Sequence, residues 1–155
     1  MRVAVSADHA GVLLRRRVVE HLRAGGHDVL DLGIDDPDLP DDYPDRAAEC
    51  GRAVTEGRAE VGVLLCGSGA GAAIAANKLK GVRAALCHDS FSARQSREDD
   101  DANVMCLGER VIGAGLALEL IDRFLASSFT GAERHQRRLN KVLALEAAFG
   151  APQGD

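Results

Sequence analysis

Residues 60–78 read EVGVLLCGSGAGAAIAANK and join an apolar run to a helical segment through a glycine-rich turn. The run over residues 60–66 is almost continuously apolar, which is typical of a parallel strand covered on both faces. Glycines interrupt it at once, and the small aliphatic residues over 70–78 then favour a helix. A strand that leads directly into a helix is the repeating unit of an α/β fold.

The same alternation of short apolar runs and helical segments recurs along the chain. We expect five strands, at residues 2–7, 27–32, 60–66, 82–87 and 103–107. Apolar periodicity favours helices at about residues 12–23, 45–56, 70–78, 90–97 and 114–126. This order predicts an α/β fold with a doubly wound parallel sheet. No linker or repeat divides the chain, so we expect a single domain over residues 1–150 and a frayed tail over 151–155.

One expected helix has no strand after it. Residues 132–149 contain the basic stretch ERHQRR and continue with LNKVLALEAAF. We expect this C-terminal helix to pack on a partner subunit or on another part of the domain. The acidic stretch IDDPDLPDDYPD over residues 34–45 is expected to form a surface loop.

Composition excludes several classes of function. The net charge of −5 and the isoelectric point near 5.5 give no basic surface for nucleic acid or for an anionic membrane. No apolar run approaches the roughly 20 residues that a membrane span needs. The N-terminal residues MRVAVSADHAG lack the pattern of a secretory leader, so we expect a cytoplasmic protein. The four cysteines show no CxxC spacing, and neither structural disulfides nor a metal site is expected.

Two strand ends carry most of the chemistry. In sheets of this class, ligands bind beyond the carboxyl ends of the strands, where the strand order reverses. If the order is 2-1-3-4-5, that crevice separates strand 1, which leads into Asp8 and His9, from strand 3, which leads into Cys66 and the glycine run. We interpret the pair as a functional site. The alternative is two ordinary turns, with Asp8 as a helix N-cap.

The glycine run offers backbone N–H groups that can converge on an oxyanion or a phosphate. Cys66 stands immediately before it, where a helix N-terminus and aligned amides favour the thiolate. Such a thiolate can act as a base or as a nucleophile. The alternative for a cysteine at the end of a buried strand is core packing, which we expect for Cys50, Cys87 and Cys106.

Six motifs in order resemble the type B ribose-5-phosphate isomerases and the related galactose-6-phosphate isomerase subunits. The likeness covers residues 1–150, and it implies a Rossmann-like five-stranded parallel sheet, no cofactor, and a homodimer or dimer of dimers with shared sites. A second branch of the family uses a glutamate as base, and here that position is Ala72. The motifs are DHAG (8–11), DYPD (42–45), CGSGAGAAIAANK (66–78), GVRAALCHD (81–89), ANVMCLGERVIG (102–113) and ERHQRR (133–138).

The resemblance implies a role for each matching residue. Cys66 abstracts the substrate proton, and Ser68 with the amides of Gly67, Gly69 and Gly71 steadies the enediolate oxygens. The sugar hydroxyls and the phosphate contact Asp8 and His9, and Tyr43 lines the site. Three arginines hold the phosphate, some of them from the neighbouring subunit: Arg110, Arg134 and Arg138.

One segment departs from the family pattern. Type B ribose enzymes carry a histidine, assigned to opening the furanose ring, and then an asparagine, where this chain has Asp99 and Asp100. Asp99 can replace the imidazole as acid–base, with Asp100 contacting the substrate. Alternatively, the substrate has no ring to open, as for a tetrose 4-phosphate. In a third interpretation the segment is a solvated acidic turn.

These observations lead to one leading function and two alternatives. We expect an aldose–ketose isomerase that interconverts ribose 5-phosphate and ribulose 5-phosphate through a cis-enediolate. An isomerase of another phosphorylated sugar, a tetrose 4-phosphate or a hexose 6-phosphate, is the alternative within the same class. From a different class, the chain is a non-catalytic sugar-phosphate-binding module, which would need the arginines but not the thiol.

Overall fold

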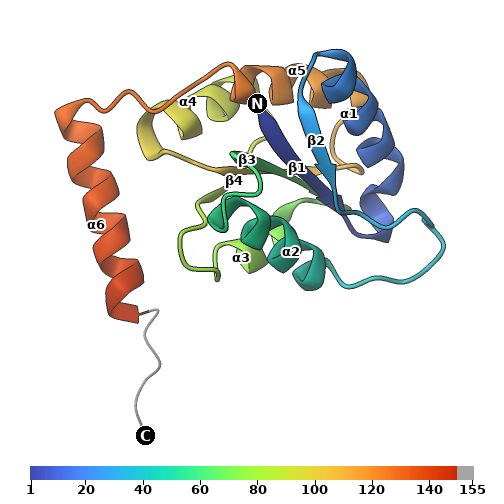
Figure 1. Cartoon of the computed structure of the whole chain (residues 1–155), viewed down its shortest axis with the longest axis horizontal. Coiled ribbons are helices and arrows are strands. Elements are labelled where there is room, and N and C mark those ends of the chain that lie inside the picture. The colour runs from blue at the N-terminus through green and yellow to red at the C-terminus, as the bar shows by residue number, and fades with distance from the viewer. Residues whose placement is uncertain (150–155) are drawn as a thin grey trace, which may run out of the picture.

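The computed structural model describes residues 1–149, so the expected frayed tail at 151–155 lies outside the described residues. One parallel sheet runs through the molecule in the order β2-β1-β3-β5-β4 (Figure 1). The predicted α/β fold with a five-stranded parallel sheet is therefore confirmed. The strands are β1 (Arg2–Ala7), β2 (Asp28–Asp31), β3 (Val61–Cys66), β4 (Ala84–Leu86) and β5 (Val104–Gly108).

The assumed order 2-1-3-4-5 is wrong for the last two strands. β5 pairs directly with β3, from Gly62 opposite Val104 to Cys66 opposite Gly108, and β4 lies at the edge. Burial explains the exchange, because every residue of β5 is buried whereas the short β4 is partly exposed and suits an edge. The reversal of strand order between β1 and β3 is unaffected.

Helices cover both faces of the sheet. Helices α1, α4 and α5 pack on one face, and α2 and α3 pack on the other (Figure 1). The predicted helices are present, with ends that differ by a few residues. They are α1 (Val12–Ala24), α2 (Tyr43–Thr55), α3 (Ala70–Ala76), α4 (Ser90–Asp100), α5 (Ala114–Leu125) and α6 (Glu133–Phe149), with a short 3-10 turn, η1 (His9–Gly11), before α1.

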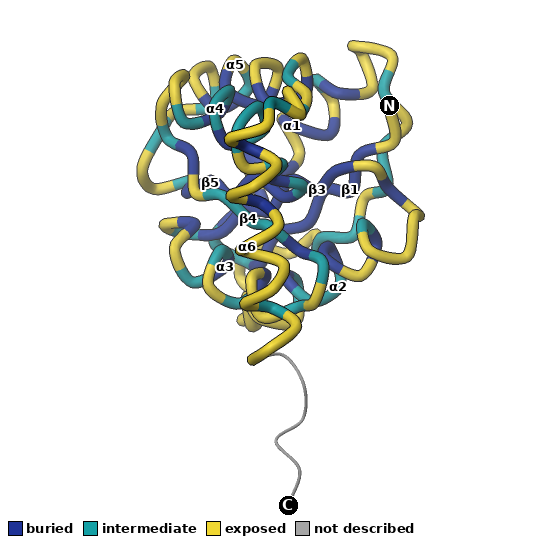
Figure 2. Tube along the Cα trace, turned by 90° about the vertical axis from the view of Figure 1, so that its left-hand side faces the viewer, coloured by how far each residue is buried: buried dark blue, intermediate teal, exposed yellow. Residues whose placement is uncertain are grey.

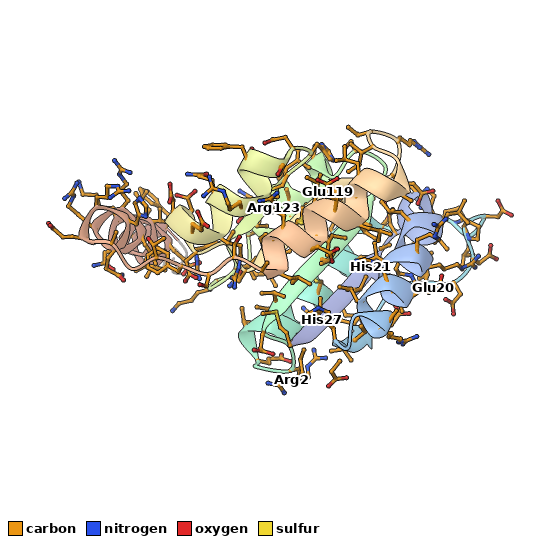
Figure 3. The ribbon with its side chains drawn as sticks, turned by 90° about the horizontal axis from the view of Figure 1, so that it is seen from above. Arg2, Glu20, His21, His27, Glu119 and Arg123 are labelled. Atoms are coloured by element: carbon orange, nitrogen blue, oxygen red, sulfur yellow. The ribbon has the colours of Figure 1, made fainter. Side chains whose placement is uncertain are left out.

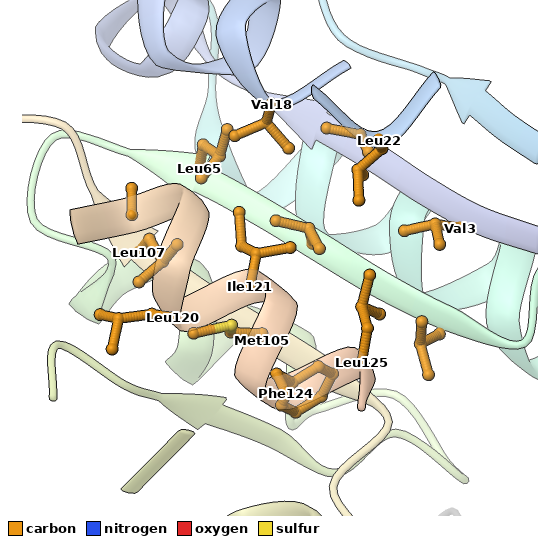
Figure 4. Close-up of a cluster of buried hydrophobic side chains, with 14 of the residues drawn as sticks. Val3, Val18, Leu22, Leu65, Met105, Leu107, Leu120, Ile121, Phe124 and Leu125 are labelled. Carbon is orange, nitrogen blue, oxygen red and sulfur yellow. The ribbon is translucent and has the colours of Figure 1, made fainter. Parts of the chain in front are cut away.

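The larger core fixes the sheet against α1 and α5. Ile121 and Phe124 of α5 are fully buried against the strands, together with Leu65 and Met105 (Figure 4). Burying a side chain of this size stabilises the fold by about 1.5–3 kcal/mol. The helices also meet through polar contacts, since His21 of α1 lies beside α5 with its Nε2 2.7 Å from Asp122 (Figure 3). The strand ends therefore sit on a rigid support.

A buried arginine shapes the acidic loop. Arg15 on α1 is only 2% exposed, and it donates to the carboxylate of Asp31, to the carbonyl oxygen of Ile34 at 2.7 Å and to Asp35. These bonds hold the start of the loop over residues 32–42 against α1. The loop then leads into α2, which begins at Tyr43.

The C-terminal helix α6 stands apart from the two helical layers (Figure 1), and most of its length is exposed (Figure 2). Among its described side chains, His135 and Leu139 are buried, whereas Val142, Leu145 and Phe149 are half or more exposed. A groove of about 630 Å³ runs between α6 and residues 77–85. None of the helices in residues 1–149 has the length and apolar character needed to cross a bilayer.

Candidate active site

The carboxyl ends of β1 and β3 form a pocket of about 390 Å³. Ala7 pairs with Leu65 in the sheet, so the following residues, Asp8 and Cys66, stand side by side at the strand ends. The crevice expected from the strand order is therefore present. The pocket is lined by Asp8, His9, Ala10, Tyr43, Cys66, Gly67, Ser68, Gly71, Arg110 and Val111.

The sulfur of Cys66 accepts a hydrogen bond from a backbone amide of the glycine loop. The Gly69 N–H donates to Cys66 Sγ at 3.0 Å, and the cysteine is 5% exposed. Gly69 has a positive φ of 80°, and a Cβ at this position would lie 3.0 Å from the backbone carbon of Leu107. Glycine is thus required for the turn that aims this amide at the sulfur. The loop therefore places a hydrogen-bond donor directly against the sulfur.

The other three cysteines belong to the core. Burial raises the pKa of Cys50 to about 12, and it also raises the pKa values of Cys87 and Cys106. All three are nearly inaccessible, and none lines the pocket. Cys66 is therefore the cysteine that combines a pocket position with a stabilising donor.

Asp8 and His9 are held by their own backbone and by the acidic loop. Asp8 Oδ1 accepts from the Ala10 N–H at 3.0 Å, so the carboxylate does cap the following turn, and burial raises its pKa. His9 Nδ1 lies 3.1 Å from the carbonyl oxygen and 3.2 Å from the backbone nitrogen of Asp41. These contacts occupy Nδ1, which leaves Nε2 for a ligand.

Two residues of the site surroundings were missed by the sequence analysis. Asp41 meets His9 across the sheet edge and has its Oδ2 3.3 Å from Arg46. Its sequence context indicated only a surface loop. Glu109 precedes Arg110, and its Oε2 accepts from the Leu14 N–H at 2.9 Å, which satisfies a free amide in the first turn of α1. No local signal predicts a contact between residues so far apart in the chain.

Tyr43 and Gly71 fit each other closely. A Cβ at Gly71 would lie 2.9 Å from Cζ of Tyr43, so a larger residue would displace the ring that walls the pocket. Ser68 is exposed at the mouth, and its Oγ accepts from the Ala70 N–H at 3.2 Å. Arg110 is also exposed, and its backbone N–H donates to the Gly67 carbonyl at 3.0 Å. The glycine loop is thereby fixed to the end of β5.

Four predicted site residues lie elsewhere. Asp99 and Asp100 end α4, which runs back to the amino ends of the strands, where the next residue, Asp101, pairs with Arg83 at 2.8 Å. Five strand residues span about 16 Å, so these carboxylates and Cys66 lie at opposite ends of the strands. Asp100 lines the groove beside α6. Arg134 and Arg138 lie on α6 itself, at the β4 side of the molecule (Figure 1).

The two α6 arginines have no carboxylate partner within residues 1–149. Both are exposed, and neither makes an ion pair with any other residue of the described range 1–149. By contrast, Arg137 on the same helix lies 3.7 Å from Glu133. Arg134 and Arg138 are four residues apart and therefore project from one face. They form a pair of free guanidinium groups suited to one phosphate.

Within residues 1–149, no group of three or more His, Cys, Asp or Glu side chains is placed to hold a metal ion. The expectation that the chain needs no cofactor stays a prediction. The pocket instead offers a cysteine sulfur, backbone amides, a hydroxyl and a guanidinium. This set can remove a proton from carbon and stabilise an anionic intermediate.

Comparison with known proteins gives the chain its family. The model of the family described as Ribose/Galactose Isomerase matches residues 3–142. Ribose-5-phosphate isomerase B of Escherichia coli is 39% identical over 145 residues, which cover 94% of this chain and 96% of that protein. D-erythrulose-4-phosphate isomerase of Pectobacterium atrosepticum is 40% identical over 131 residues, which cover 84% and 86%.

A solved structure shows the same fold. Ribose-5-phosphate isomerase B of Clostridium thermocellum superposes with a TM-score of 0.93 at 40% identity, covering 96% of this chain and 99% of that one. Sequence and structure thus agree over nearly the whole length, and they confirm the resemblance drawn from the six motifs. The chain belongs to the ribose/galactose isomerase family.

Proposed function

We propose that this protein is an aldose–ketose isomerase that interconverts ribose 5-phosphate and ribulose 5-phosphate, with Cys66 as the base. The observation that carries the proposal is the Gly69 N–H bond to Cys66 Sγ inside the pocket of a member of this family. The relatives named ribose-5-phosphate isomerase B support the substrate. A cytoplasmic location is part of the same proposal.

The reaction moves one proton between neighbouring carbons. The Cys66 thiolate takes the proton from C2 of the open-chain aldose, and the electron pair flows onto the C1 carbonyl to give a cis-enediolate. The proton on O2 then moves to O1, and the thiol, whose proton can exchange with solvent, protonates C1 to give the ketose. Ser68 and the amides of Gly67 and Gly71 stabilise the negative charge on oxygen, while the Gly69 N–H stays with the Cys66 sulfur. A positioned base of this kind accelerates such a step by about 10² to 10⁴-fold.

A second copy of the chain completes the site in this proposal. Four of the expected site residues lie away from the pocket that contains Cys66, so a single chain does not bring them to the same substrate. They are Asp99, Asp100, Arg134 and Arg138. A homodimer or dimer of dimers that places α6 of one subunit over the pocket of the other supplies the arginines. Arg110 of the pocket then shares the phosphate with them. The exposed apolar residues of α6 support such packing.

A four-carbon sugar phosphate is the second candidate substrate. Asp99 and Asp100 replace the histidine and asparagine of the type B ribose enzymes, and a relative at 40% identity is named D-erythrulose-4-phosphate isomerase. A tetrose 4-phosphate cannot close a furanose because its O4 is esterified. Such a substrate needs no ring-opening group.

The test is a panel of aldose and ketose phosphates of four to six carbons, assayed with purified protein. The proposal predicts turnover of ribose 5-phosphate above the other sugars. Efficient turnover of the tetrose 4-phosphate, with ribose 5-phosphate nearly inert, selects the second candidate. Binding without turnover of any sugar would contradict both and would indicate a sugar-phosphate-binding module.

A further inference from the structure

The end of α4 is joined to the start of α6 by a small polar network. Asp99 Oδ1 lies 3.2 Å from His135 Nδ1, and Gln95 Nε2 donates to Asp99 Oδ2 at 3.0 Å. Both carboxylate oxygens of Asp99 therefore already have partners within their own chain. His135 Nδ1 is also 2.9 Å from Thr130 Oγ1, and the Thr130 N–H donates to the Glu98 carbonyl at 3.0 Å. The network links the loop before α6 to α4 as well.

His135 and Leu139 determine how α6 is rotated about its axis. They are four residues apart on one stripe of the helix, and they are 3% and 8% exposed. Arg134 and Arg138 occupy the adjacent stripe, one residue earlier at each turn, and both face solvent. A helix advances about 100° per residue. Any rotation that frees His135 from Asp99 therefore turns both guanidinium groups by the same angle.

We propose that Asp99 is a positioning residue, which acts through His135 to aim Arg134 and Arg138 at the phosphate of the substrate, and that it is not the proton shuttle of ring opening. The contacts of both its oxygens favour this role over proton exchange with a sugar. The inference rests on the proposed function only for the ligand of the arginines. An oxygen beside the ring nitrogen of a buried imidazole restrains the ring, and the oxygen of an amide can do this as well as that of a carboxylate.

Two substitutions at position 99 separate the roles. Asp99→Ala removes the oxygens that lie beside His135 and Gln95, whereas Asp99→Asn keeps one oxygen there but cannot exchange a proton. We expect Asp99→Ala to weaken binding of inorganic phosphate to the resting protein, measured by calorimetry, by about three- to tenfold. KM for the sugar phosphate should rise equally, with kcat within about twofold of wild type. Asp99→Asn should stay within about twofold on every measure.

His135→Ala and the double variant complete the cycle. If Asp99 acts through His135, the double variant should bind phosphate no more weakly than the worse single variant. Glu133→Ala is the matched control. It removes one carboxylate from the same helix, but that carboxylate lies beside Arg137 and not beside His135. Phosphate binding by Glu133→Ala should stay within about twofold of wild type.

Several outcomes would overturn the inference. A fall in kcat for both Asp99→Ala and Asp99→Asn, with unchanged phosphate binding, would make Asp99 an acid–base catalyst. A lower melting temperature of Asp99→Ala with unchanged phosphate binding would show that the network has only a structural role. Losses of phosphate affinity that multiply in the double variant would show that Asp99 and His135 act independently. If wild type binds phosphate but isomerises no sugar, the proposed function fails while the phosphate constants still decide the role of Asp99.

Discussion

Replacing Cys66 separates its chemistry from its contribution to stability. Cys66→Ala removes the proposed base and also leaves the Gly69 N–H, now 3.0 Å from the sulfur, without its acceptor. An unsatisfied buried donor costs about 1–3 kcal/mol. For a domain of this size, each kcal/mol lowers the melting temperature by about 2–4 °C. We therefore expect a protein that is folded but melts several degrees lower.

Cys66→Ser is the matched variant, because its hydroxyl can accept the same hydrogen bond while being a far weaker base. It should melt close to wild type. Both variants should lose about 10² to 10⁴-fold in kcat, the share of a positioned general base. The assay combines steady-state isomerisation with thermal melts followed by circular dichroism. Near-wild-type kcat in either folded variant would refute the assignment of Cys66.

Four further predictions follow from the same site. Alkylation at neutral pH should label Cys66, and substrate should protect it, because burial raises the pKa values of the core thiols; labelling confined to Cys50 would count against this. Activity should survive exhaustive chelation, and loss restored by one divalent ion would overturn the cofactor-free mechanism. Arg138→Ala should weaken binding of the phosphorylated sugar by roughly 1.5–3 kcal/mol and should change binding of the dephosphorylated analogue little. Equal losses of binding free energy for both sugars would assign Arg138 to a structural role. Burial raises the pKa of Asp8 in the folded state, so the folded protein binds more protons and ionised Asp8 lowers the stability at neutral pH. Asp8→Asn should therefore raise the melting temperature at pH 7, and this gain should disappear as the pH falls through the folded and then the unfolded pKa of Asp8. An unchanged melting temperature of Asp8→Asn at pH 7 would contradict the prediction.

The elements were predictable because their signals are local. The buried strands β1, β3 and β5 are almost continuous apolar runs, and such runs identify strands covered on both faces. The order of β4 and β5 was not predictable in the same way. The apolar run over residues 82–87 predicted a longer strand than the three residues of β4. The greater burial of β5 depends on how the helices pack on the sheet, which the sequence pattern does not show.

The site was predictable only in part. The positions of Asp8, His9 and Cys66 at the ends of two strands predicted that they lie close together, because the carboxyl ends of neighbouring parallel strands meet at one edge of the sheet. The contact between His9 and Asp41 was not predictable, since it depends on how Arg15 folds the acidic loop. The position of Asp99 against His135 likewise depends on the packing of α6. Motif spacing carries no information on such contacts.

Proton transfer with solvent tests the central claim most directly. Purified protein is incubated with ribose 5-phosphate in deuterated water until equilibrium, and the sugar is followed by proton NMR. An enediolate mechanism with Cys66 as base predicts ribulose 5-phosphate as product, deuterium from the solvent at C1 of the ketose and at C2 of the aldose, and neither product nor exchange with Cys66→Ser on the same timescale. Isomerisation without any solvent deuterium, or exchange that persists in Cys66→Ser, would contradict the account.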